Sequence, residues 1–387
     1  GEHLRALELR AVLAKLPERE EPRRPVEATG CTCTPIDSLP ALQEAIAAHP
    51  APKAFAVCTE GQISFAFSPK QSYVVTAGET LFDAVLEPAQ VYRALAPLLQ
   101  DALVEKLVFD GKSLRHNAAG FGVDVRHIAF DAMIADYLLN AIRPATTLQQ
   151  TCERHLGTLQ ASAALLFPLR ERMRALLEQQ SMTALYDDME LPLSGVLYHM
   201  ECEGFRVDDA VLLQMQSQFE TRAGELASEI YTQAGETFNI LSPKQLGTVL
   251  FEHLKLPPQR KTKSGYSTDA DTLDRLAPLH PVVRLIQEYR FLTKLKSTFV
   301  DGLLAARAPA DGRVRTRFQQ CVTATGRISS TEPNLQNIPV RTALGREIRK
   351  AFVASEGNVL IGADYSQIEL RILAHLSEDD GLIEAFR

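Results

Sequence analysis

The sequence lacks the features expected of a membrane protein, a secreted protein or a zinc protein. No window approaches ~18 uncharged apolar residues, so we expect no transmembrane helix and no membrane partner. The N-terminus has no apolar signal-peptide core. Of the six cysteines, Cys31 and Cys33 lie close together, but no second pair completes a zinc site. These absences predict a cytoplasmic globular protein whose reduced cysteines contribute to packing.

The net charge also argues at first against nucleic acid, because the chain carries −7 at neutral pH. The average conceals an asymmetry. Residues 241–350 contain 19 Lys or Arg and 9 Asp or Glu, a local balance of +10 that leaves −17 for the rest. A locally basic segment suits a groove for a polyanion, because phosphate contacts depend on local charge. A solvated basic face would have the same composition, so charge alone leaves both interpretations open.

Hydrophobic patterns divide the chain into regions of different character. Residues 1–25 predict a helix followed by a charged, proline-containing linker. Residues 26–186 mix strand and helix patterns, which predicts an α/β domain. Strands are expected within 52–76 and at 106–110, and helices near 88–103, at 131–142 and at 148–156.

The chain changes character near residue 187. Residues 187–312 are mostly helical in pattern, interrupted by a polar, basic loop at 257–268. Helical periodicity over 282–304 predicts a long helix that carries Lys294 and Lys296. A β-like pattern begins at residue 313 and leads into an unusually polar segment.

That segment, TATGRISSTEPNLQNIPVR (323–341), has few apolar residues and many side-chain hydrogen-bond donors. Gly326 and the two prolines predict turns. Such a set could bind phosphates, sugars and the minor-groove edges of bases, although an ordinary polar loop would look the same. The donors are Thr325, Arg327, Ser329, Ser330, Asn334, Gln336, Asn337 and Arg341.

A second segment, NVLIGADYSQIELRILAHLS (358–377), joins a short apolar run to an amphipathic pattern. Val359–Ile361 predict a strand, and the spacing of Ile368, Ile372 and Leu376 predicts a helix. Asp364 therefore falls where a strand gives way to a helix. A carboxylate there could bind Mg²⁺, or it could simply cap the helix, and spacing alone favours the cap.

These two segments resemble the family A DNA polymerases, the group of bacterial DNA polymerase I. DYSQIELR (364–371) is similar to that family's first catalytic palm motif, and TGRISSTEPNLQNIP (325–339) to its primer–template binding segment. Weaker similarity to the family's thumb continues upstream through SPKQLGTVLFE and KTKSGYST, and the resemblance covers most of 187–387.

The resemblance implies an α/β and α+β multidomain fold. Its parts would be a degenerate RNase H-like exonuclease domain (26–186), a mostly helical thumb (187–312) and the first part of a polymerase palm (313–387), after the N-terminal helix and linker (1–25). It also implies two Mg²⁺ ions, primer–template DNA and deoxynucleoside triphosphates as cofactors and partners. The expected location is the cytoplasm, at the bacterial nucleoid.

The resemblance assigns roles residue by residue. Asp364 would ligate both metal ions, with the carbonyl of Tyr365 near one of them, and Glu369 would exclude a ribose 2′-OH. Arg327 would reach the minor groove at the primer end. The other implied DNA-binding residues are Thr325, Ser329, Asn334, Gln336, Asn337, Arg341, Lys261, Lys263, Lys294 and Lys296.

Two departures from the family pattern limit these expectations. In FAVCTEG (55–61), Cys58 stands where the first exonuclease motif has a metal-binding Asp. The second motif's Asp falls near Leu114, and no Tyr-x-x-x-Asp equivalent is evident. Since two-metal hydrolysis needs several carboxylates and Glu60 alone cannot supply them, we expect the exonuclease fold to be inert.

The second departure concerns the polymerase itself. The family's fingers helix is absent from the 387 residues, and so is the later His-Asp-Glu motif with its second metal-binding Asp. We therefore expect DNA-templated DNA synthesis to need a further fingers-and-palm segment or chain, and this chain to be inactive alone. A non-catalytic DNA-binding scaffold is the alternative. Activity as a 3′–5′ exonuclease is a third hypothesis, and Cys58 argues against it because it stands in place of a metal-binding Asp.

Overall fold

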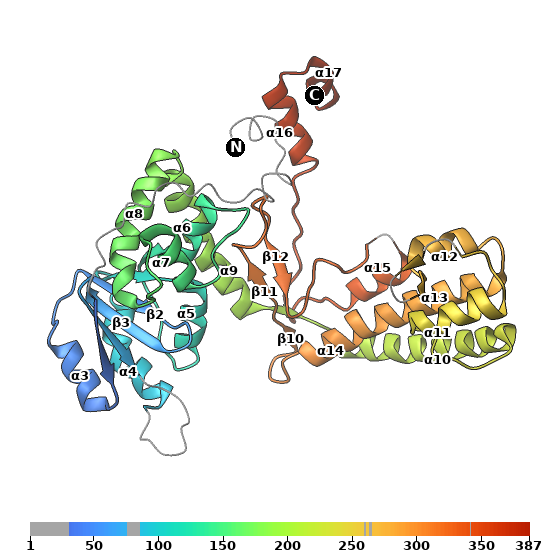
Figure 1. Cartoon of the computed structure of the whole chain (residues 1–387), viewed down its shortest axis with the longest axis horizontal. Coiled ribbons are helices and arrows are strands. Elements are labelled where there is room, and N and C mark those ends of the chain that lie inside the picture. The colour runs from blue at the N-terminus through green and yellow to red at the C-terminus, as the bar shows by residue number, and fades with distance from the viewer. Residues whose placement is uncertain (1–30, 76–85, 259–260, 263–264, 341) are drawn as a thin grey trace. The chain divides into compact units, whose positions relative to one another are not determined.

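The computed structural model of the chain describes residues 31–75, 86–258, 261–262, 265–340 and 342–387 (Figure 1). The predicted helix and linker in residues 1–25 lie outside these ranges, as do Lys263 and Arg341. The chain separates into two compact units, each built from two stretches of sequence. The first unit contains residues up to Gly204 together with Arg315–Asn337, and the second contains Phe205–Val314 with Ile338–Arg387.

The first unit is organised around a mixed six-stranded sheet with the order β1-β4-β3-β2-β5-β6. β2, β3 and β4 form an antiparallel meander, whereas β1 pairs with β4, β5 with β2 and β6 with β5 in parallel. The strands are β1 (Thr32–Ile36), β2 (Ala54–Cys58), β3 (Ile63–Ser68), β4 (Gln71–Val75), β5 (Glu105–Val108) and β6 (Ile128–Asp131).

Helices cover both faces of this sheet. Alternation along β2 shows why: Phe55 and Val57 enter one hydrophobic cluster, and Ala56 and Cys58 enter the other. The first cluster includes residues of α3 (Leu39–Ala47), α4 (Pro88–Gln100) and α5 (Gly111–Ala119). The second includes residues of α6 (Ala132–Leu139), α7 (Leu148–Leu156), η1 (Ala163–Leu165) and α8 (Leu166–Gln179).

The sequence predictions for this region are confirmed at their centres. All three strands of 52–76 form, as does the strand at 106–110, and the helices at 88–103, 131–142 and 148–156 are shorter by a few residues or coincide. β1 and β6 were not predicted from the sequence. β1 contains a proline and is largely exposed at the sheet edge, and β6 has four residues that run directly into α6.

The first unit ends with two helical segments and a two-stranded ribbon. The π-helical η2 (Leu185–Glu190) continues into α9 (Leu191–Glu203). After the chain has passed through the second unit, β11 (Arg317–Gln319) pairs antiparallel with β12 (Ser329–Thr331). Phe318 lies opposite Ser330 in this ribbon. The polar segment singled out in the sequence therefore begins on a hairpin rather than a free loop.

The second unit is mostly helical, as the sequence predicts. Its longest helices, α10 (Asp209–Ala234) and α13 (Pro281–Leu295), pack against each other (Figure 1). The predicted long helix at 282–304 is confirmed, with a π-helical stretch in its second half. The smaller elements are α11 (Pro243–Gly247), η3 (Thr248–His253), α12 (Ala270–Leu276), η4 (Lys296–Asp301), α14 (Gly302–Ala306), α15 (Ala343–Lys350), β7 (Phe205–Arg206), β8 (Lys261–Thr262), β9 (Gly265–Tyr266) and β10 (Arg313–Val314).

One prediction for the second unit is wrong. Val359–Ile361 do not form a strand: the segment has no regular secondary structure, and Val359 and Ile361 are 79% and 89% exposed. A strand requires a hydrogen-bonding neighbour, and no described strand pairs with this segment. The helical half of the prediction is confirmed by α16 (Ile368–Ser377), which is followed by α17 (Asp380–Ala385).

Among the described helices, none combines the length and the apolar composition that crossing a membrane requires.

Candidate nucleic-acid interface and active site

The polar segment after β11 is held in shape by its own side chains. Gln336 accepts a hydrogen bond from the Ser330 amide at 3.3 Å, and its Nε2 donates to the Ile328 carbonyl at 2.8 Å. The buried Ser330 hydroxyl accepts from the Leu335 amide at 3.1 Å. These contacts occupy the side-chain amide of Gln336, so this predicted DNA-binding residue braces the segment.

Other predicted DNA-binding side chains of this segment lie at the surface. Thr325, Arg327, Asn334 and Asn337 are exposed, and Ser329 is half-buried in β12. Gly326 adopts a positive φ of 77°, which glycine reaches without strain, at the turn that presents Arg327. Four of the sequence-predicted residues thus lie exposed around one ribbon in the first unit.

The candidate catalytic acid belongs to the second unit. Asp364 is exposed, and no hydrogen bond or ion pair of its carboxylate occurs among the described residues. It does not cap α16, which begins at Ile368 after Gln367 and has no side-chain cap. The interpretation of Asp364 as a helix cap is therefore wrong, and its carboxylate is left without a structural task.

The neighbours of Asp364 are similarly arranged at the surface. Tyr365 is exposed, and Glu369 lies in the first turn of α16. Asp364 and its hard oxygens fit one ligand position of a magnesium site. No group of three or more His, Cys, Asp or Glu that could hold a metal ion occurs in the described ranges. The acid therefore fits as one ligand, and further ligands would have to join it.

The predicted lysines of the thumb differ in their surroundings. Lys294 is exposed on α13. Lys296 instead forms ion pairs with Glu220 at 3.1 Å and Asp301 at 2.8 Å, and these partners raise its pKa. Lys261 contributes its backbone to β8. Between Lys294 and Lys296, Lys294 is thus the one whose placement suits a contact with a DNA phosphate without breaking an ion pair.

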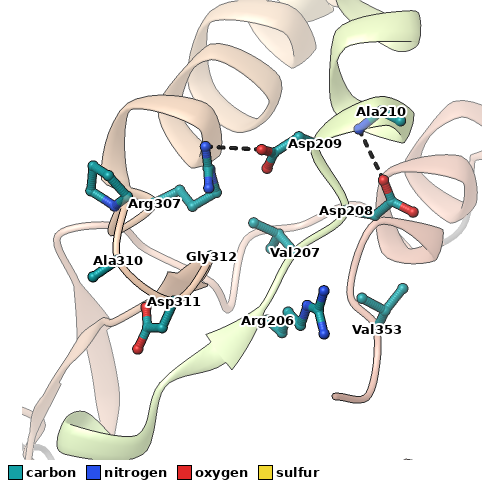
Figure 2. Close-up of a pocket in the computed structure, with 11 residues that line it drawn as sticks. Arg206, Val207, Asp208, Asp209, Ala210, Arg307, Ala310, Asp311, Gly312 and Val353 are labelled. Atoms are coloured by element: carbon teal, nitrogen blue, oxygen red, sulfur yellow. Dashed lines mark hydrogen bonds and ion pairs between the residues drawn. The ribbon is translucent and has the colours of Figure 1, made fainter. Parts of the chain in front are cut away.

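A pocket in the second unit contains none of the predicted site residues (Figure 2). It lies beside the start of α10, where Asp208 accepts a hydrogen bond from the Ala210 amide at 2.9 Å. Arg307 pairs with Asp209 across its wall at 2.9 Å (Figure 2). Its charged groups thus largely neutralise each other.

Of the three motif positions considered in the exonuclease-like region, Cys58, Glu60 and Leu114, one holds an acid. Cys58 ends β2 and is buried, and desolvation raises the pKa of its thiol to about 11. Glu60 accepts a hydrogen bond from the Leu148 amide at 2.8 Å, at the start of α7. Leu114 is buried in the hydrophobic core. Cys58 and Leu114 thus supply no carboxylate, and the carboxylate of Glu60 accepts a hydrogen bond from a helix amide.

Two further acids of this region, Asp110 and Asp131, were not singled out in the sequence. Asp110 adopts a positive φ of 58° and caps α5 by accepting from the Ser113 amide at 3.1 Å. Asp131 is fully buried and accepts from the amides of Gly111 (2.7 Å) and Met133 (3.0 Å). Burial, and then the nearby Asp110, raise the pKa of Asp131 to about 7. Both carboxylates thus stabilise turns.

The sequence analysis also missed a buried acid on α9. Glu201 is 1% exposed and contacts Lys112, His116, Arg317 and the Phe318 amide. Its spacing from Ser194 and Leu197, which are both buried, was the available signal, because residues at i, i+3 and i+7 share one helix face.

Comparison with known proteins agrees with this architecture. The family described as "DNA polymerase family A" matches residues 209–387, and "DNA polymerase I, ribonuclease H-like domain" matches residues 62–161. The DNA polymerase I of Geobacillus stearothermophilus is 43% identical over 316 residues, which cover 75% of this chain and 36% of that protein. The DNA polymerase I of Caldicellulosiruptor bescii is 46% identical over 291 residues, covering 73% and 34%.

A solved structure is also similar. It is the POL domain of Pol1 from M. smegmatis in complex with DNA primer-template and dNTP, with a TM-score of 0.76 and 36% identity. The match covers 92% of this chain and 65% of that one. The chain belongs to the family A DNA polymerases. Within that family the relatives above are bacterial DNA polymerases I, and the chain spans about a third of their length.

Proposed function

We propose that this chain is the part of a DNA-directed DNA polymerase that binds primer–template DNA and supplies the first catalytic acid of templated nucleotidyl transfer. The observation that carries the proposal is Asp364, an exposed carboxylate with no structural task, in a segment that matches the polymerase family. The predicted domains, 26–186, 187–312 and 313–387, are proposed as the exonuclease-like domain, the thumb and the start of the palm.

Each site residue has a proposed task in that reaction. Asp364, with the Tyr365 carbonyl beside it, would hold Mg²⁺. When bound, the two ions would lower the pKa of the primer 3′-OH and neutralise charge on the triphosphate. Glu369 would exclude nucleotides that carry a 2′-OH. Arg327 would donate to minor-groove acceptors at the primer end, where every base pair presents one.

The remaining polar residues would position the duplex. Thr325, Ser329, Asn334, Gln336 and Asn337 surround the β11–β12 ribbon and would contact sugars and bases. Lys294 and Lys296, with Lys261, Lys263 and Arg341, would contact phosphates, as the excess of basic residues in 241–350 suggests. Deoxynucleoside triphosphates and primer–template DNA are the proposed partners, in the cytoplasm at the bacterial nucleoid.

A non-catalytic DNA-binding scaffold is the second candidate. It is favoured by the absence, among the described residues, of any group of three or more His, Cys, Asp or Glu that could hold a metal ion, because two metal ions normally share more than one carboxylate. The two candidates differ in whether the chain can become active when a fingers-and-palm segment is supplied.

Primer extension separates these candidates. The 387-residue chain, purified to a single mass, is incubated with Mg²⁺, primer–template DNA and four deoxynucleotides. We expect duplex binding without extension, and extension once the C-terminal fingers-and-palm segment of a relative is added. Extension by the chain alone would contradict the inactivity we propose. Binding without extension under both conditions would favour the scaffold.

A further inference from the structure

The exonuclease-like domain and α9 both contact the polar ribbon, through Lys112 and the buried carboxylate of Glu201. Glu201 extends from α9 into the space between α5 and β11. Its Oε1 accepts hydrogen bonds from Lys112 Nζ and, at 2.7 Å, from the Phe318 amide. Its Oε2 lies 2.6 Å from His116 Nε2 and 3.3 Å from the Arg317 guanidinium. All these residues belong to the first unit.

Glu201 and Lys112 together replace a neighbouring strand at the free edge of the ribbon. While Glu201 accepts from the Phe318 N–H, Lys112 Nζ donates to the Phe318 carbonyl at 2.8 Å. In an antiparallel ribbon both backbone groups of one residue point to the same side. Phe318 therefore turns both groups away from β12, and the ion pair satisfies an edge that would otherwise be open.

This contact selects one register of the ribbon. If β11 slipped by one residue, the backbone groups facing Glu201 would point the other way, and a buried charge would lose its partners. Buried ion pairs contribute little net stability compared with apolar residues of the same size. Specifying a position is thus the better account of why a carboxylate occupies this site.

Further contacts fix the same stretch of chain on either side of Phe318. Arg315 donates to the Cys202 carbonyl at 2.8 Å, and Gln320 donates to the Glu190 side chain at 2.6 Å. Tyr137 of α6 donates to the Thr323 carbonyl at 2.8 Å. The stretch that leads into Thr325 and Arg327 is thus attached to the exonuclease-like domain and α9 at several successive residues.

We infer that Glu201 is a positioning residue for DNA binding: through Lys112 and Phe318 it uses the inert exonuclease-like domain as a platform that fixes the ribbon carrying Arg327. The DNA-related part of this inference rests on the proposed function. The positioning part does not, because it concerns contacts within the first unit. Arg327 and its neighbours remain the groups that would touch DNA, and Glu201 acts through them.

Hydrogen exchange tests the positioning part without DNA. In Glu201→Gln, we expect amide exchange in peptides covering 315–337 to accelerate by about tenfold or more, because the Phe318 edge loses its charged partner. Asp136→Asn is the matched control. Asp136 is also buried and also pairs with an Arg and a His, Arg154 and His155, but it does not contact the ribbon. Its exchange effect should be centred on 132–156 and should not reach the amides of 315–320, although Tyr137 of the same helix contacts Thr323.

A double-mutant cycle tests the DNA part on the same chains. We expect Arg327→Ala to weaken binding of a labelled primer–template by about tenfold in the otherwise unchanged chain, and by less than about twofold in Glu201→Gln. A similar loss in both backgrounds would overturn the positioning role. Failure of the unchanged chain to bind the duplex would refute the proposed function instead, and hydrogen exchange would still decide the structural part.

Unchanged exchange at 315–337 in a folded Glu201→Gln variant would overturn the inference. Should circular dichroism show that this variant does not fold, Lys112→Met takes its place. That change removes the donor to the Phe318 carbonyl but keeps the Glu201 carboxylate. Hydrogen exchange at 315–337 and the double-mutant cycle with Arg327→Ala then test the inference in this variant.

Discussion

Two regions of this chain carry the acids considered above as metal ligands or motif residues, and the surroundings of these carboxylates differ. In the exonuclease-like sheet, Glu60 accepts from the first amide of α7, Asp110 caps α5, and Asp131 accepts from backbone amides in a buried turn. In the segment before α16, Asp364 is exposed and has no structural contact among the described residues. The acids of the first region stabilise the fold, while the acid of the second remains available to a ligand.

This contrast suggests how a nuclease-like fold can remain stable when Cys58 stands where the family pattern has a metal-binding Asp. Cys58 removes one negative charge from a buried position, where several carboxylates close together would repel each other without metal ions. The acids of this region accept hydrogen bonds from backbone amides, which offset part of their desolvation. Under the inference drawn above, the domain supports the neighbouring ribbon through the contacts of Glu201 with Lys112 and Phe318.

The largest predicted effect concerns the available acid. Asp364→Asn, tested in the chain supplemented with a fingers-and-palm segment, should lower primer extension by roughly 10³-fold or more, because a neutral amide is a poor ligand for Mg²⁺. Duplex affinity should change little. Asp380→Asn is the control, since Asp380 is also an exposed acid of the same segment. Equal extension by both variants would show that Asp364 is not catalytic.

The reverse change in the exonuclease-like region should destabilise without restoring activity. Cys58→Asp places a carboxylate at a buried position near Glu60 and Asp110, so we expect about 4 kcal/mol less unfolding free energy. Cys58→Ala is the control for the loss of packing. Neither variant should remove a mismatched 3′ end in Mg²⁺, because the Glu60 carboxylate already accepts a hydrogen bond from the Leu148 amide of α7. Excision by Cys58→Asp would show that the acids of the exonuclease-like region are not only structural, contrary to the difference drawn between the two regions.

These residues also show what could be predicted from the sequence. The sheet core, the thumb helices and α16 have clear periodicity, and the motif around Asp364 identifies the family. The strand at Val359–Ile361 could not be judged from its own residues, because a strand depends on a partner elsewhere. Glu201 was missed for a similar reason. Its four contacts come from α5 and β11, which are far from it in sequence.

A third prediction uses pH to test whether Asp131 is structural. Its pKa in the folded chain is raised from the ordinary 3.8 to about 7. The stabilisation from its proton is complete below about pH 4 and is lost as the pH rises towards 7. The stability difference between the unchanged chain and Asp131→Asn should therefore fall by about 3 kcal/mol between about pH 4.5 and 7.5.

Denaturant unfolding at several pH values measures that difference. Asp136→Asn is the control, because the pKa of Asp136 is lowered, with hydrogen bonds from His155, Ala145 and Arg154 outweighing its desolvation. A lowered pKa gives stabilisation that is lost only below the ordinary value, so this control difference should stay constant over the same range. A constant difference for Asp131→Asn as well would mean that burial does not raise its pKa.

The smallest effect is expected at Glu60, the acid nearest Cys58. Glu60→Ala removes the acceptor for the Leu148 amide at the start of α7, which should lower the unfolding free energy by about 1 kcal/mol. Glu44→Ala, an exposed acid on α3 without such a contact, should cost less than about 0.5 kcal/mol. If Glu60→Ala were neutral in stability but changed the binding of Mn²⁺ or Mg²⁺ measured by calorimetry, Glu60 would be a remaining metal ligand. The exonuclease-like region would then keep part of its ancestral site, and its acids could no longer be regarded as wholly structural.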